Sequence, residues 1–327
     1  MQLAPPLPSA GPAAVARQEK MVHDLGLAEV FMKRETLASD LLLLLTAAIW
    51  GFAFAAQRVG MEHVGPFTFN GVRFLLGAAA LVPVVLRVQS SQGPKQALRP
   101  KASPRAYAVG GLLAGCVLFA GASLQQVGLV YTTAGKAGFI TGLYVVFVPL
   151  LGLFAGQRPG AGAWLGASAA TVGMYLLSIN ESFSMDSINY GDALVLACAV
   201  CFALHVLLIG YLAPRLEPVT LSCLQFAWCG ALSLITAAAM EDVAWSGIAA
   251  AGLPILYGGL LSVGVAYTLQ VVAQRKAEPT HAAILLSMES VFAALGGYLF
   301  LDEMMSGRAV AGCALMLAGM LASQLRP

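Results

Sequence analysis

Apolar runs long enough to cross a bilayer alternate with short polar breaks from Leu41 to the end of the chain. A transmembrane helix needs about 17–25 mostly apolar residues, and these runs meet that length. Backbone polar groups in lipid must be satisfied within the spanning segment, so the runs are predicted to be helices and not open strands. The ten predicted helices lie at 41–60, 66–86, 106–130, 133–155, 162–179, 190–212, 218–240, 249–273, 280–301 and 308–324.

The polar breaks differ in charge on the two sides of the predicted membrane. The break at 87–105 holds five Lys and Arg residues and no acid, and the breaks after the fourth, sixth and eighth helices are also basic. The opposite breaks, such as 180–189 and 240–247, carry acids and no Lys or Arg, with Arg308 as the one exception. By the positive-inside rule the basic breaks are cytoplasmic. Both termini are therefore predicted to be cytoplasmic.

A weak internal repeat divides the chain into two halves. An offset of 152 residues places Asp40 on Asp192, and an offset of 145 places the LQQVG that begins at Leu124 on the LQVVA that begins at Leu269. Each copy has five predicted helices, so the second copy must enter the membrane from the opposite side. Inverted repeats that move around a central site are typical of secondary transporters.

Composition agrees with lipid as the main solvent. The chain is 59% hydrophobic and 10% charged, with a mean hydropathy of +0.80, whereas soluble domains carry about 25% charged residues. A net charge of +2 and the lack of a basic run interleaved with aromatic residues argue against nucleic acid as a partner. The six cysteines fall in apolar runs and are interpreted as small buried residues, so no metal site and no cofactor are predicted.

The predicted organisation has three parts. Residues 1–39 are rich in Pro and Ala, lack the apolar core of a signal peptide, and are expected to form a disordered cytoplasmic tail. A short interfacial helix near 22–31, or a true start at Met32, are open alternatives. The first five-helix repeat is assigned to 40–181 and the second to 188–325.

Several helices resemble those of one transporter family. The runs LLTAAIWGFAFAAQRVG and PFTFNGVRFLLGAAAL, with a Trp-Gly and an Arg-Phe, resemble the first two helices of the EamA family in the drug/metabolite transporter superfamily. YTTAGKAGFITGLYVVFVPLLGLFAGQRP resembles its fourth helix and AAILLSMESVFAALGGYLFLDEMMS its ninth, although Ser290 stands where the family commonly has proline. The resemblance covers about residues 38–325. It implies ten helices, a cavity between helices one, three, four, six, eight and nine, and export of amino acids, metabolites or drugs across the inner membrane.

Ionisable residues inside membrane helices are candidates for function. Glu289 lies halfway along the ninth helix, where it could bind an amine, carry a proton or form a structural hydrogen bond. His205, midway along the sixth helix, could titrate near neutral pH or stay neutral against a neighbouring helix. Gln125 and Gln270 are repeat mates that could either contact substrate or join helices.

Three aromatic residues, Trp50, Tyr144 and Tyr267, lie too deep for the interfacial belt. Each could line a cavity or pack between helices. Arg73 in the second helix is interpreted as a structural charge or as part of a gate salt bridge.

Lys136 and His281 are repeat mates near the starts of the fourth and ninth helices, close to opposite faces. Lys136 could reach water by snorkelling. Alternatively, it could line an outer vestibule that attracts anions, or pair with an acid in a gate.

The segment around Lys136 also resembles a phosphate-binding loop. Six residues separate Gly128 from Gly135, and Ala137 stands where that loop needs Ser or Thr, so no ATP site is predicted. We therefore expect a gradient-driven secondary carrier for a small metabolite, such as an amino acid or a drug-like compound. We place it in the lipid bilayer of a bacterial inner membrane, as a monomer or homodimer, with the proton as a candidate coupling ion. The rival hypotheses are an intramembrane enzyme using Glu289 and His205, and a scaffold or channel.

Overall fold

The structure, a computed structural model, describes residues 12–90, 102–132, 134–178, 190–300 and 306–325. Side chains are described over slightly shorter ranges, because those of 12–35, 134–136, 177–178, 296–300 and 324–325 are left out. Within these ranges every regular element is a helix. The all-helical prediction is confirmed.

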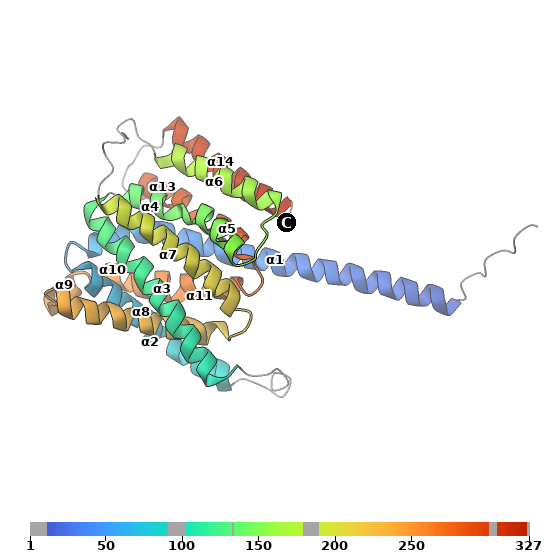
Figure 1. Cartoon of the computed structure of the whole chain (residues 1–327), viewed down its shortest axis with the longest axis horizontal. Helices are drawn as coiled ribbons and strands as arrows, with labels where there is room; N and C mark the ends of the chain where they lie inside the picture. The colour runs from blue at the N-terminus through green and yellow to red at the C-terminus, as the bar shows by residue number, and fades with distance from the viewer. Residues whose placement is uncertain (1–11, 91–101, 133, 179–189, 301–305, 326–327) are drawn as a thin grey trace, which may run out of the picture.

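Five membrane-crossing segments form each half of the described chain (Figure 1). Those of the first half are α1 (Pro12–Gly60), α2 (Pro66–Ser90), α3 (Pro104–Tyr131), the pair α4 (Ala134–Gly142) and α5 (Tyr144–Phe154), and α6 (Ala161–Ser178). The second half begins with α7 (Tyr190–Leu212), α8 (Pro218–Met240) and the series α9 (Trp245–Ala250), α10 (Gly252–Leu256), η2 (Tyr257–Tyr267) and α11 (Thr268–Ala273). It ends with the pair α12 (Pro279–Leu286) and α13 (Glu289–Phe300), and α14 (Gly307–Leu325).

The ten predicted helices correspond one to one to these segments. Among the described residues, seven helices are long and apolar enough to cross a membrane, and two shorter apolar helices cover Pro279–Leu295 and Gly307–Ser323. The helix α6 completes the set. The chain is therefore an integral, multi-pass membrane protein.

The N-terminal segment differs from the expected disordered tail. The helix α1 begins at Pro12 and runs without a break into the first span, so that it projects from the bundle (Figure 1). Forming the first turn of a helix costs free energy, whereas adding further residues to an existing helix costs little. The first span is the existing helix from which this extension continues. Residues 1–11 lie outside the described part.

The contacts between helices of the two halves come in pairs, in which the repeat mates exchange places. The repeat mates α2 and α8 pack on each other, and so do the mates α6 and α14. The helix α3 packs on α7 and α8, while its mate, the series η2 and α11, packs on α1 and α2. This reciprocity confirms the inverted repeat.

The helices α6 and α14 lie side by side (Figure 1), and glycines occupy the points where they meet. A Cβ atom on Gly166 would come within 2.8 Å of the Gly319 carbonyl oxygen, and one on Gly173 within 2.6 Å of the Gly312 carbonyl oxygen. Small residues let membrane helices approach closely where no hydrophobic force joins them. This contact therefore needs residues without side chains at the crossing points.

A glutamate carboxylate caps the start of both α2 and α8, but it comes from a different part of the chain in each case. The Glu217 carboxylate accepts hydrogen bonds from two backbone N–H groups of α8, at 3.0 and 2.7 Å. Gly65 holds the equivalent position before α2, and the Glu241 carboxylate reaches across from the end of α8 to accept from the N–H groups of Phe67 and Thr68, at 2.7 and 2.8 Å. A carboxylate satisfies the free amides of a helix start in both cases. The second cap also fastens the two halves together.

Two spans predicted as single helices, 133–155 and 280–301, are interrupted near mid-length. The first breaks at Leu143 and the second at Ser287 and Met288. The hydroxyl of Ser287 donates to a carbonyl three residues back at 2.8 Å, and such back-bonding competes with the regular ladder. The break therefore forms even though Ser290 replaces the proline of the family pattern.

The eighth span is also irregular. Its central part, η2, is an 11-residue π-helix. Elements of this kind are rare and often occur at functional sites. All three irregular spans of the described chain contribute residues to the cavity described below.

The glycine contact between α6 and α14 can be tested by overpacking. We expect Gly173→Leu to lower the midpoint of thermal unfolding in detergent, because the new side chain meets the α14 backbone and overpacking costs about 1–3 kcal/mol. The control is Gly307→Ala, since a Cβ there meets no atom of the described residues within 4 Å. Equal midpoints for wild type and both variants would refute the close packing.

Candidate functional site

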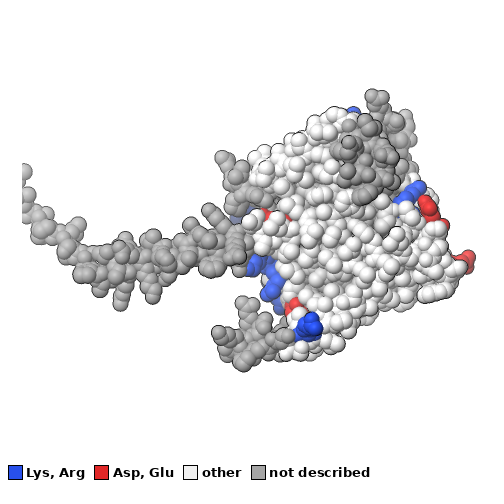
Figure 2. All heavy atoms as spheres, turned by 180° about the vertical axis from the view of Figure 1, so that it is seen from behind, with Lys and Arg blue, Asp and Glu red and all other residues white. Residues whose placement is uncertain are grey.

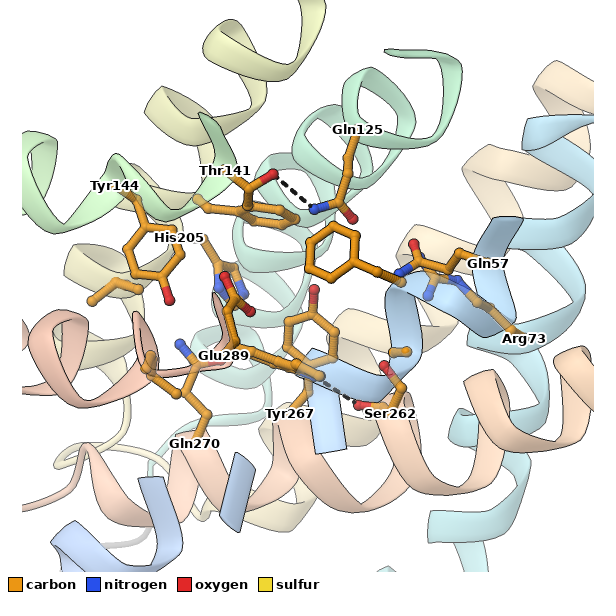
Figure 3. Close-up of a pocket in the computed structure, with 16 residues that line it drawn as sticks. Gln57, Arg73, Gln125, Thr141, Tyr144, His205, Ser262, Tyr267, Gln270 and Glu289 are labelled. Carbon is orange, nitrogen blue, oxygen red and sulfur yellow. Dashed lines mark hydrogen bonds between the residues drawn. The ribbon is translucent and has the colours of Figure 1, made fainter. Parts of the chain in front are cut away.

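Helices of both halves enclose a cavity at the centre of the bundle (Figure 3). Its internal volume is about 40 Å³, which is room for a few water molecules. The surrounding helices would have to move apart for the cavity to admit a metabolite.

All seven residues predicted to bind substrate or line a cavity lie in its wall. They are Trp50, Gln125, Tyr144, His205, Tyr267, Gln270 and Glu289. Arg73, expected to be a structural or gating charge, lies there too, so α2 joins the six helices expected around the cavity. Their part in binding stays a prediction.

The cavity wall is built largely from repeat mates. Offsets of 152 and 145 residues relate six pairs of lining residues: Trp50 with Phe202, Ala53 with His205, Phe54 with Val206, Gln125 with Gln270, Thr141 with Leu286, and Tyr144 with Glu289. The two halves therefore contribute matching positions to the wall. Transporters with inverted repeats commonly bind substrate at this boundary.

An aromatic cluster forms one wall around Tyr267. The ring centre of Trp50 lies 4.4 Å from that of Tyr267, and the rings of His205 and Phe74 lie at 6.1 and 6.0 Å. The Trp50 indole Nε1 donates to the backbone oxygen of Ser262 at 3.2 Å, which fixes the ring against η2. Aromatic rings at these spacings attract one another beyond their area burial.

A second part of the cavity gathers oxygen atoms around Glu289. This residue is the first of α13 and is only 4% exposed, and its Oε1 has no hydrogen-bond partner among the described residues. The Tyr144 hydroxyl lies near enough to interact with the carboxylate, but without hydrogen-bond geometry. Gln270 leaves its Oε1 free as well, since only its amide nitrogen is bonded, to Gln274. Buried polar atoms are normally bonded, so several free ones together mark a site for a ligand or water.

The opposite part of the cavity contains Arg73 and Gln57 (Figure 3). Arg73 is 3% exposed, and its guanidinium lies over the rings of Phe74 and Phe69, at 5.0 and 5.4 Å. Its Nε donates to the Asn70 side chain at 3.0 Å, which leaves the terminal N–H groups free of described hydrogen bonds. Among the described side chains neither Arg73 nor Glu289 has an ion-pair partner.

His205 is held by one hydrogen bond, 2.9 Å from its Nε2 to the Gln225 Oε1. Gln225 is the repeat mate of Arg73 and lies outside the cavity wall. No hydrogen bond or ion pair joins His205 to Glu289 among the described residues. The acid–base pair of the enzyme hypothesis therefore gains no structural support.

Sequence reasoning missed some polar lining residues, among them Gln57. The residues Trp50, Ala53, Phe54 and Gln57 follow the spacing i, i+3, i+4 and i+7, which places them on one face of α1. That periodicity could have identified Gln57 from Trp50. No such periodicity identifies Ser262, which reaches the cavity from the π-helix η2.

The remaining two predicted residues are His281 and Lys136. His281, near the start of α12, does not line the cavity and contacts the Asp40 carboxylate at 2.8 Å. The side chain of Lys136 lies outside the described residues. Its alternative roles, snorkelling to water, lining an outer vestibule or pairing with an acid, therefore stay predictions.

Two inverted five-helix halves around a central cavity define a membrane protein of the transporter class. The chain matches the model of the EamA-like transporter family twice, over residues 37–179 and 189–323, and it belongs to that family. An uncharacterized transporter of Archaeoglobus fulgidus is 30% identical over 297 residues, covering 89% of this chain and 87% of that protein. The uncharacterized transporter YoaV of Bacillus subtilis is 21% identical over 276 residues, or 83% and 91% of the two chains.

A solved crystal structure has a similar fold, with a TM-score of 0.70 at 19% identity. The likeness covers 88% of this chain and 96% of the other. At this identity it shows a shared fold. Family and fold together make this chain a membrane transporter, which contacts lipid and a small-molecule substrate.

Proposed function

We propose that this protein is a secondary carrier that exports a small zwitterionic metabolite, such as an amino acid. One observation carries the proposal: a buried carboxylate and a buried guanidinium line the same cavity without pairing with each other. A buried charge is costly unless it is compensated. A substrate with an ammonium and a carboxylate would compensate both.

The free atoms match such a substrate. An ammonium group has three donors, and Glu289, Gln270 and Tyr144 offer oxygen atoms on one side of the cavity. Arg73 offers N–H groups on the other side, in the planar arrangement that suits a carboxylate. The rings of Trp50 and Tyr267 lie between these groups and suit an apolar substrate body.

Alternating access follows from the two inverted halves. The cavity lies at their boundary, so rocking one half against the other would expose it to each face in turn. The basic loops support cytoplasmic termini, and Lys and Arg side chains gather at the end of the bundle from which α1 projects (Figure 2). A bacterial inner membrane and outward transport are what the resemblance to the EamA family implies. Glu289 is also the candidate for a coupling proton, because it would have to release a bound proton or ammonium for the cycle to continue.

The substrate class can be tested with matched ligands and the fluorescence of Trp50. We expect a zwitterion such as leucine, or another of the common amino acids, to raise the thermal midpoint and change the Trp50 emission. The matching amine and acid alone, 3-methylbutylamine and 4-methylpentanoate for leucine, should bind at least about tenfold more weakly, since each loses a charged contact of about 1.5–3 kcal/mol. The emission change should vanish in Trp50→Phe and persist in Trp164→Phe, because Trp164 does not line the cavity. Equal binding of an amine and its zwitterion would exclude Arg73 as an anion site.

The role of Glu289 can be tested by Glu289→Gln in proteoliposomes. If the carboxylate binds the substrate ammonium, the variant should lose about 10- to 100-fold in affinity, in exchange as well as in net export. A pure proton carrier would lose uphill, pH-driven export but keep downhill exchange. The matched control is Glu278→Gln, an exposed glutamate before α12. Wild-type transport, affinity and pH dependence in Glu289→Gln would make the carboxylate structural.

The orientation can be tested by cysteine labelling in intact cells. A cysteine introduced at Ser90, in the basic loop 87–105, should react with an impermeant reagent only from the cytoplasm. A cysteine at Ser182 should react only from outside, because basic loops stay inside. Reaction of both positions from the same side would contradict the inverted topology.

A further inference from the structure

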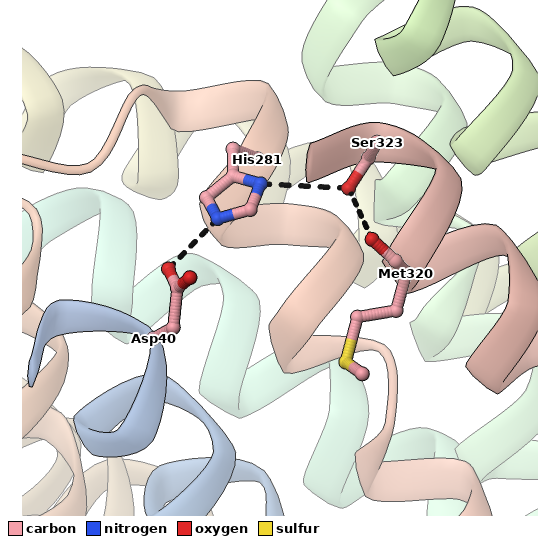
Figure 4. Close-up of polar contacts among 4 residues, drawn as sticks. All are labelled: Asp40, His281, Met320 and Ser323. Atoms are coloured by element: carbon pink, nitrogen blue, oxygen red, sulfur yellow. Dashed lines mark hydrogen bonds and ion pairs between the residues drawn. The ribbon is translucent and has the colours of Figure 1, made fainter. Parts of the chain in front are cut away.

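The same repeat position carries an aspartate in each half, and each aspartate bonds to the other half. Asp40 in α1 and Asp192 in α7 are related by the 152-residue offset. The Asp40 Oδ1 lies 2.8 Å from the His281 Nε2 of α12 (Figure 4). The Asp192 Oδ1 accepts a hydrogen bond of 2.6 Å from the hydroxyl of Thr132, the cap of α3.

The two contacts lie at opposite faces of the bundle. We call the face near Asp40 and His281 the α12 face, and the face near Thr132 and Asp192 the α7 face. The first span and α12 both begin at the α12 face, whereas α3 ends and α7 begins at the α7 face. Each face therefore has one aspartate contact between the two halves.

We propose that the Asp40–His281 and Asp192–Thr132 contacts are two latches, one at each face, which open in turn as the halves rock. The proposal rests on the alternating access proposed above. Both latches are formed in this structure. Opening the cavity to one face requires the latch of that face to break.

The helices joined by the latches carry the cavity wall. At the α12 face they are α1, with Trp50, and α12, with Leu286. At the α7 face they are α3, with Gln125, and α7, with His205. Separating either pair of helices would open a path from that face to the cavity.

The Asp40–His281 contact has the properties of a breakable bond. The His281 side chain is 20% exposed and the Asp40 side chain 10%. Water can therefore hydrogen-bond to the imidazole and the carboxylate when the contact breaks. Ser323 of α14 lies behind the ring, with its Oγ 3.5 Å from Nδ1, and donates to the Met320 carbonyl at 2.7 Å (Figure 4).

The test measures access to the cavity from each face. The six native cysteines are replaced, and one cysteine is introduced at Ser262 in the cavity wall. Its reaction rate with the impermeant thiol reagent MTSET is measured in right-side-out and inside-out vesicles. We expect Asp40→Ala and His281→Ala to raise the rate from the α12 face by at least about fivefold, because each biases the population toward the state open there.

The double variant and the opposite face make the test specific. Asp40→Ala combined with His281→Ala should react no faster than either single variant, since both remove the same bond. The double variant is needed because Asp40 makes further contacts, which Asp40→Ala also removes. The mirror variant Asp192→Ala should raise the rate from the α7 face instead.

The control is Glu278→Ala, which removes an exposed acid near His281 and should leave both rates unchanged. Variants are compared only when they are monodisperse. If the alanine variants do not fold, Asp40→Leu and His281→Phe, which keep similar size but cannot form the bond, take their place. Unchanged rates at both faces in folded variants of Asp40 and His281 would overturn the latch. Labelling needs no substrate, so the result is independent of whether the cavity binds a zwitterion.

Discussion

The odd number of helices in each repeat is the constraint on which the rest of the structure depends. Five crossings leave the second copy upside down relative to the first, so the halves are related by an axis in the membrane plane. Mates that touch each other, such as α6 with α14 and α2 with α8, must lie on that axis. The reciprocal approach of Gly166 to Gly319 and of Gly173 to Gly312 has this symmetry. The cavity lies between the halves for the same reason.

Duplication supplies a symmetric wall, whereas the proposed zwitterionic substrate has two unlike ends. The repeat mates around the cavity differ in chemistry. Tyr144 corresponds to Glu289, and Ala53 corresponds to His205. Arg73 corresponds to a glutamine outside the wall. Each pair gives the two halves unlike groups at matching positions, so the charge asymmetry of the cavity comes from divergence within a symmetric frame.

The sequence was sufficient for the number of helices, the inverted repeat and the seven central residues. Apolar length fixes the spans because backbone polar groups in lipid must be satisfied within each spanning helix. The position of a polar or aromatic residue near the middle of a span then identified candidates for the cavity wall, such as Glu289 and Trp50. The helix breaks were not predictable, because they depend on local hydrogen bonds such as that of Ser287. The position of Arg73 depends on the angle between packed helices, and the helical extension to Pro12 on cooperativity with the first span.

The two kinds of contact between the halves differ in the relative movement of the halves that they allow. At the α6–α14 crossing the backbones meet through glycine, with no side chain to rearrange, and this crossing lies on the axis. The contacts at the two faces, represented by Asp40 and Asp192, are polar bonds away from the axis. A rotation about an axis in the membrane plane changes distances least on the axis and most at the faces. The glycine crossing can therefore act as a pivot, and the same small rotation that separates the helices at one face presses them together at the other.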